Sequence, residues 1–80
     1  RKHKQYHFVI GANCQVSRIS SLLKDAVMEE SPRDGNVLIT VKDEESHEKT
    51  SISLPFLYNI SSEVMESIKS VEGVFEVQAD

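Results

Sequence analysis

Residues 6–27 read YHFVIGANCQVSRISSLLKDAV, and this stretch predicts the first half of the fold. Tyr6, Phe8 and Ile10 alternate along an aromatic and β-branched run, which is typical of a strand with one buried face. A short turn follows, in which Asn13 is suited to cap a helix. Apolar residues then recur at intervals of three and four, which predicts an amphipathic helix that packs on the strand.

The rest of the chain predicts three more strands and a second helix. Ser61 or Ser62 is placed to cap that helix, and Gly73 is placed to end it. A stretch rich in turn-forming residues, 31–36, separates the first helix from the second strand. The predicted elements are strands at residues 37–41, 50–54 and 74–78, and a helix with apolar positions from residue 60 to residue 71.

The order strand, helix, strand, strand, helix, strand predicts an α+β fold, the ferredoxin-like βαββαβ sandwich. We expect a four-stranded antiparallel sheet with two helices on one face. Residues 6–80 form a single ferredoxin-like domain in this interpretation, and residues 1–5 form a basic entry segment or linker. Val9, Leu38 and Val74 would lie on the other face of the sheet, which favours a homo-oligomer such as a dimer.

The charge distribution limits the choice of partners. Nine Lys and Arg residues oppose thirteen Asp and Glu residues, for a net charge of −4. Three of the nine bases, Arg1, Lys2 and Lys4, lie at the N-terminal end, so the remainder is acidic and no nucleic-acid partner is predicted. The basic start fits a solvated terminus or attachment to a preceding membrane span. A single cysteine, Cys14, indicates a reducing compartment, so we expect a cytoplasmic protein or one at the cytoplasmic face of a membrane.

The turn Gly11, Ala12, Asn13 and Cys14 is the candidate ligand-binding site. A strand–glycine–helix turn presents backbone N–H groups that can hold an anion or lower the pKa of a thiol. The plainer interpretation is that the glycine makes the bend and the cysteine is a small, half-buried residue. The acidic stretch 43–48 could hold a cation such as Mg²⁺ through its carboxylates, or it could be a solvated hairpin tip.

The sequence contains no arrangement typical of catalysis. A nucleophile requires a neighbouring histidine and an orienting carboxylate, and no such set is evident, nor is there a phosphate-loop or zinc-protease motif. We therefore predict that the protein is not an enzyme and uses no cofactor. A small-molecule or cation effector is the expected kind of ligand.

The chain resembles ACT-type regulatory domains, including the soluble C-terminal domain of MgtC-like membrane proteins. The resemblance rests on SIKSVEGVFEV at residues 67–77, a helix that ends in Gly-Val before an edge strand. The passage Ser53-Leu54-Pro55, a strand that runs into a proline, is a lesser similarity. The resemblance implies a non-enzymatic regulatory or oligomerisation domain, as in the cytosolic part of a membrane protein for ion transport.

The first turn also resembles the heavy-metal-associated domain of copper chaperones and P-type ATPases, whose motif is G-M-x-C-x-x-C. Gly11 and Cys14 match that motif, while Ala12 and Ser17 stand where the methionine and the second cysteine would be. This resemblance implies an alternative function, a degenerate metal-binding domain with Cys14 as the metal ligand. Cu(I) prefers soft thiolate ligands.

Overall fold

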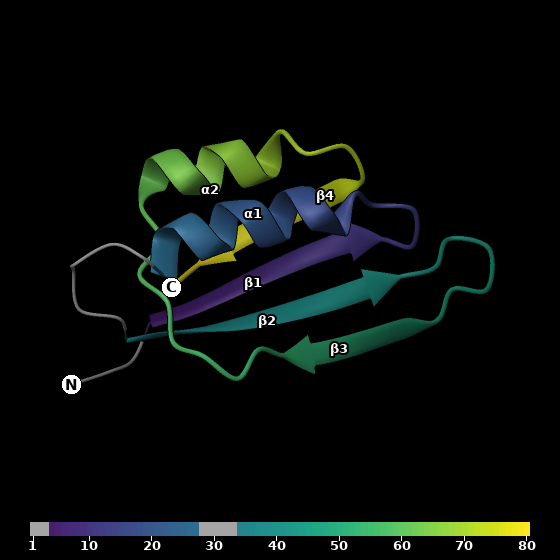
Figure 1. Cartoon of the computed structure of the whole chain (residues 1–80). Helices are drawn as coiled ribbons and strands as arrows, with labels where there is room; N and C mark the ends of the chain where they lie inside the picture. The colour runs from purple at the N-terminus through teal and green to yellow at the C-terminus, as the bar shows by residue number, and fades with distance from the viewer. Residues whose placement is uncertain (1–3, 28–33) are drawn as a thin grey trace.

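A computed structural model of the chain describes residues 4–27 and 34–80. Figure 1 shows the helices lying beside the sheet. Residues 1–3 of the predicted basic segment and residues 31–33 of the turn-forming stretch 31–36 lie outside the described residues. The predicted order of elements is confirmed: β1 (Lys4–Gly11), α1 (Val16–Val27), β2 (Gly35–Lys42), β3 (Lys49–Ser53), α2 (Ser62–Lys69) and β4 (Val74–Ala79).

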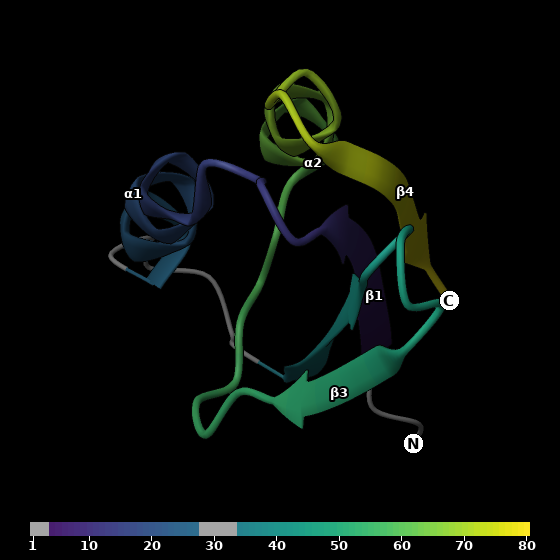
Figure 2. The ribbon, with the colours of Figure 1, turned by 90° about the vertical axis from the view of Figure 1, so that its right-hand side faces the viewer.

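The sheet is mixed, so the prediction of a purely antiparallel sheet is wrong. Its strand order is β3-β2-β1-β4. β1 and β2 are parallel neighbours, whereas β2 with β3 and β1 with β4 are antiparallel. In a ferredoxin-like sandwich another strand separates the two strands of the βαβ unit. Here α1 returns the chain directly beside β1, and β3 folds back on the outer side of β2. Both helices lie on one face of the sheet, as Figure 2 shows.

The helix-side face of β1 forms the centre of the core. Tyr6, Phe8 and Ile10 are all buried, which confirms the alternation in the sequence. Burying side chains of this size contributes about 1.5–3 kcal/mol each. The helices pack on this face from above, and their buried residues are Ile19, Leu23 and Ile68.

The second helix begins as its sequence predicts, but it ends at Lys69 with Ser70 as its C-cap, before the predicted stop at Gly73. The Oγ atom of Ser61 accepts a hydrogen bond from the Val64 N–H (3.1 Å), so Ser61 is the N-cap. Gly73 follows the helix with φ 93°, and a Cβ there would lie 2.6 Å from the Cα of Cys14. Both facts require glycine. The first helix begins at Val16, which leaves Asn13 three positions ahead of it rather than at the cap.

A register shift distinguishes the pairing of β1 with β4. Val9 pairs with Glu76, but the next residue, Ile10, pairs with Val74, so Phe75 is an extra residue in β4. Val74 therefore packs against the core, and its predicted place on the other face of the sheet is wrong. Such a bulge bends the strand that carries it.

The segment after β3 returns along β2 with two residues looped out. The Leu54 N–H donates to the Val37 carbonyl (2.9 Å), and Tyr58 exchanges two hydrogen bonds with Gly35 (2.8 and 2.7 Å). An unbroken antiparallel register would place residue 56 opposite Gly35, so the chain between these contacts carries two extra residues. The loop turns Phe56 outward, and its side chain is 66% exposed.

Candidate functional site

The predicted binding turn lines a small hollow at the carboxyl ends of the two parallel strands. Gly11, Ala12, Asn13 and Cys14 form one wall, and residues 42–45 form another, around a volume of about 250 Å³. The carboxyl ends of neighbouring parallel strands are where open α/β sheets bind ligands. The structure thus brings together the two stretches that the sequence singled out.

Some of the backbone N–H groups of this turn already donate hydrogen bonds within the protein. The Gly11 N–H donates to the Gly73 carbonyl (2.8 Å), and the Cys14 N–H donates to the Gly11 carbonyl (3.1 Å). The backbone N–H groups of Ala12 and Asn13 make no hydrogen bond to residues 4–27 or 34–80. The expected cluster of free donors is therefore reduced to these two exposed residues.

The thiol of Cys14 is buried, in agreement with the plainer interpretation of the turn. Burial raises the pKa of the Cys14 thiol, which is the opposite of the predicted activation. A thiol that keeps its proton is a poor nucleophile and a poor metal ligand. Within residues 4–27 and 34–80, no group of three or more His, Cys, Asp or Glu side chains is placed to hold a metal ion.

The acidic wall of this hollow is a hairpin tip held by its own hydrogen bonds. The Asp43 carboxylate accepts from the Glu45 N–H (3.0 Å). The Asp43 N–H donates to the Glu48 carbonyl (2.9 Å), and the His47 N–H donates to the Asp43 carbonyl (2.8 Å). His47 adopts φ 62°, a conformation that histidine tolerates better than most residues. This pattern fits the solvated-tip interpretation of the acidic stretch.

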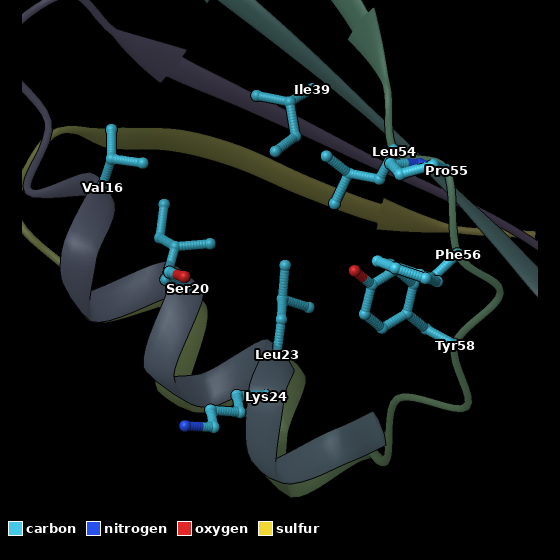
Figure 3. Close-up of a pocket in the computed structure, with 10 residues that line it drawn as sticks. Val16, Ser20, Leu23, Lys24, Ile39, Leu54, Pro55, Phe56 and Tyr58 are labelled. Carbon is cyan, nitrogen blue, oxygen red and sulfur yellow. The ribbon is translucent and has the colours of Figure 1, made fainter. Parts of the chain in front are cut away.

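A larger groove, of about 530 Å³, opens between α1 and the segment that follows β3. Val16, Ile19 and Leu23 form its helix wall, and Ser20 and Lys24 lie on the same side of the groove (Figure 3). Val16 is 55% exposed, which is unusual for a core-facing position of an amphipathic helix. The volume of the groove lies within the usual range for small-molecule sites, about 300–1,000 Å³.

The opposite wall of this groove comes from the sheet and from the looped segment. Ile39 supplies it from β2, and Leu54, Pro55, Phe56 and Tyr58 supply it from the return along β2 (Figure 3). The groove exists because β3 lies at the edge of the sheet and α1 does not cover it. An uncovered apolar surface of this kind marks a site for a ligand or a partner.

Tyr58 places one polar group in this apolar groove. Its side chain is only 7% exposed, and Figure 3 shows its hydroxyl pointing into the groove. That hydroxyl makes no hydrogen bond to residues 4–27 or 34–80. Tyr6, the other buried tyrosine, differs because its hydroxyl accepts from the Ile60 N–H (3.1 Å). A mostly apolar site with a few fixed polar groups is the usual design of a ligand pocket.

A polar row crosses the other face of the sheet. The Nε2 atom of His7 lies 2.8 Å from the Thr40 hydroxyl, which lies 2.9 Å from the Ser51 hydroxyl. His7 thus contacts the Thr40 hydroxyl, whose residue is buried, and is linked to the Ser51 hydroxyl only through it. Hydrogen-bonded side chains of this kind stabilise neighbouring strands.

Comparison of the chain with models of protein families, with curated proteins and with solved structures finds no match. The resemblances to ACT-type and heavy-metal-associated domains therefore stay predictions. Among residues 4–27 and 34–80, no helix is long and apolar enough to cross a membrane. Attachment to a preceding membrane span and a cytoplasmic location stay predictions as well.

Proposed function

We propose that this chain is a non-enzymatic regulatory domain that binds an apolar small-molecule effector in the groove between α1 and the segment after β3. The observation that carries the proposal is the apolar groove of about 530 Å³, into which the Tyr58 hydroxyl points (Figure 3). A hydroxyl held in place within a mostly apolar groove can hydrogen-bond one polar atom of a ligand and so fix its orientation. The effector is therefore an apolar molecule that carries one hydrogen-bonding group.

The rest of the groove supports this ligand class. Lys24 is the one charged side chain among the described residues that line it, so a strongly polar molecule would find few partners. The hydroxyl of Tyr58 can donate to a carboxylate or carbonyl oxygen. A regulatory rather than catalytic role is supported by the lining of the groove, which includes no histidine, cysteine or carboxylate among the described residues.

Titration of the chain with octanoate, followed by amide NMR spectra, tests the proposal. We expect shifts at α1 and at residues 54–58, and none at the turn of residues 11–14. Tyr58→Phe removes one hydrogen bond to the probe, so we expect the Kd to rise about fivefold. Phe56→Ser removes apolar wall and weakens binding in the same direction.

Leu57→Ser is the matched control for Phe56→Ser. Leu57 is the next residue and is also exposed, at 40%, but it does not line the groove. We expect its octanoate affinity to equal that of the unchanged chain. Equal affinities for Tyr58→Phe, Phe56→Ser and the unchanged chain would contradict the proposal.

A second candidate is a polar or cationic effector at the turn hollow. It is favoured by the meeting of the Gly11–Cys14 turn with residues 42–45, which supply both a base and acids. Glycine and Mg²⁺ are the probes, added to the same amide spectra. Shifts confined to Ala12, Asn13 and residues 42–45 would support this candidate. The alternative of a metal-binding domain that uses Cys14 receives less support, because its thiol is buried and its pKa is raised.

A further inference from the structure

β3 presents one uncovered edge of the sheet. The Leu54 N–H donates a hydrogen bond to the Val37 carbonyl (2.9 Å), which shows which residue pairs of β2 and β3 are hydrogen-bonded pairs. Alternation along an antiparallel ladder then directs the backbone groups of Ile52 toward β2, and those of Ser51 and Ser53 away from it. β3 is the last strand on its side of the sheet, so these groups are free to pair with another strand.

This edge lacks the usual protection. Residues 50–62 contain no charged side chain, although 28% of the chain is charged. Ile52, near the centre of the edge, is 51% exposed. Natural sheets guard such edges with charges, prolines or bulges, and within β3 only Lys49 does so.

We propose that β3 pairs with β3 of a second copy of this chain, antiparallel, about a twofold axis at Ile52. Ser51 of one copy then faces Ser53 of the other, and their free N–H and C=O groups exchange hydrogen bonds. The two Ile52 side chains meet on the helix-side face as a non-hydrogen-bonded pair, with Cβ atoms about 4.5–5.5 Å apart. The two Lys49 side chains stay apart, because each faces Pro55 of the other copy.

The charge pattern favours a second copy as the occupant of this edge. Each copy carries a net charge of −4, so two copies meet with the least repulsion through surfaces that carry no acids. β3 carries no acid, and one acid, Glu48, directly precedes it. β4 meets the condition less well, because Glu76 lies within it and Glu72 and Asp80 flank it. A twofold interface also requires a patch that complements itself, and an antiparallel strand edge has that property.

Pairing through β3 joins the two sheets into one and places the helices of both copies on the same face. The grooves then lie on either side of the axis, with the two Ile52 side chains between them. This inference goes beyond the proposed function, since a groove can bind an effector in a monomer as well.

Sedimentation velocity of the full chain, from about 1 μM to about 1 mM, tests the inference. We expect the mass to rise with concentration from 9.0 kDa toward twice that value. Ile52→Lys places two like charges opposite each other, and we expect it to raise the dimer Kd about tenfold or more. Phe75→Lys is the matched control, because it makes a similar change at a side chain of equal exposure, 50%, on β4. Its dimer Kd should stay within about twofold of the unchanged chain.

Ser53→Pro tests the backbone part of the inference. The Ser53 N–H points away from β2, so proline there removes a hydrogen bond to the second copy and none within the sheet. We expect a loss of dimer similar to that of Ile52→Lys, with an unchanged circular dichroism spectrum. A chain that stays monomeric up to about 1 mM would overturn the inference, and so would a dimer that Phe75→Lys weakens as much as Ile52→Lys. Octanoate binding by such a monomer would leave the proposed function standing.

Discussion

The two edges of the sheet differ in how well helices and side chains cover them. We call the edge at β4 the closed edge and the edge at β3 the open edge. β4 is covered by α2 on the helix side, carries a register shift opposite β1, and bears Glu76. β3 has no bulge against β2, carries no acid, and has the groove beside it. Both edges leave backbone groups unpaired, so the contrast comes from side chains and helix packing.

This difference follows from where β3 joins the sheet. With the parallel pair β1 and β2 in the middle, each antiparallel strand lies at an edge. α2 packs against β4 and against α1, which leaves no helix for β3. The apolar residues of the return segment, Phe56 above all, are consequently exposed. We infer that the open edge is the side that binds ligands or partners and that the closed edge stabilises the fold.

The largest effect is expected at the closed edge, from Gly73→Ala. Alanine would have to adopt φ 93°, a conformation that strains residues other than glycine. Its Cβ would also collide with Cys14. We expect a loss of about 3 kcal/mol in the free energy of unfolding, measured with urea. The exposed neighbour Glu72→Ala is the control and should change it by less than about 0.5 kcal/mol. A loss below about 1 kcal/mol for Gly73→Ala would show that this edge is not tightly closed.

A comparison of two buried tyrosines sharpens the contrast at the open edge. Tyr6→Phe removes a hydroxyl that accepts from the Ile60 N–H and donates to the Ile60 carbonyl (3.1 and 3.4 Å). We expect it to cost about 1–3 kcal/mol in urea unfolding, because the Ile60 N–H is left unpaired. Tyr58→Phe removes a hydroxyl that makes no such bond to residues 4–27 or 34–80, and it should cost less than about 0.5 kcal/mol. Equal losses would mean that the Tyr58 hydroxyl serves the fold and not a ligand.

A smaller effect is expected where β3 is fastened to the sheet. Thr40→Val breaks the hydrogen bonds that join Thr40 to His7 and Ser51. We expect a loss of about 1 kcal/mol in thermal or urea unfolding. Ser53→Ala, on the same face of β3, serves as the control and should have no measurable effect. If both variants behave alike, the polar row does not hold the open edge in place.

The smallest effect concerns the pH dependence of stability at Cys14. Burial raises the pKa of its thiol above the value in the unfolded chain, so the folded state holds the proton more tightly. The resulting contribution to the free energy of unfolding is fully present below about pH 8.5, and it is lost as the pH rises through the pKa of the thiol in the folded state. Unfolding free energies measured between neutral and alkaline pH should fall more steeply for the unchanged chain than for Cys14→Ala. Identical slopes would contradict the buried, protonated thiol.

The local part of the fold could be predicted from the sequence, but the strand pairing could not. The alternation of Tyr6, Phe8 and Ile10 and the cap at Ser61 depend on residues close together in the chain, and the structure confirms them. Whether β3 inserts between β1 and β2 or folds outside β2 changes no element and no local pattern. Both arrangements therefore fit the same sequence of strands and helices.

The candidate sites show the same division. The turn at Gly11 and the acidic stretch were both visible in the sequence, although their meeting at one hollow was not. The groove combines side chains from α1 and from residues 54–58, two segments without a shared motif. The signal that points to it is the uncharged run of residues 50–62, with Phe56 and Leu57 directly after a proline that ends a strand.

Amide hydrogen exchange at the two edges, measured over a range of protein concentrations, tests the contrast most directly. The N–H groups of Ser51 and Ser53 point away from the sheet at β3, and by the same alternation those of Val77 and Ala79 do so at β4. We predict that exchange at Ser51 and Ser53 slows as concentration rises, while exchange at Val77 and Ala79 stays constant. Concentration-independent exchange at both edges, or slowing at β4 alone, would contradict the assignment of β3 as the open, pairing edge.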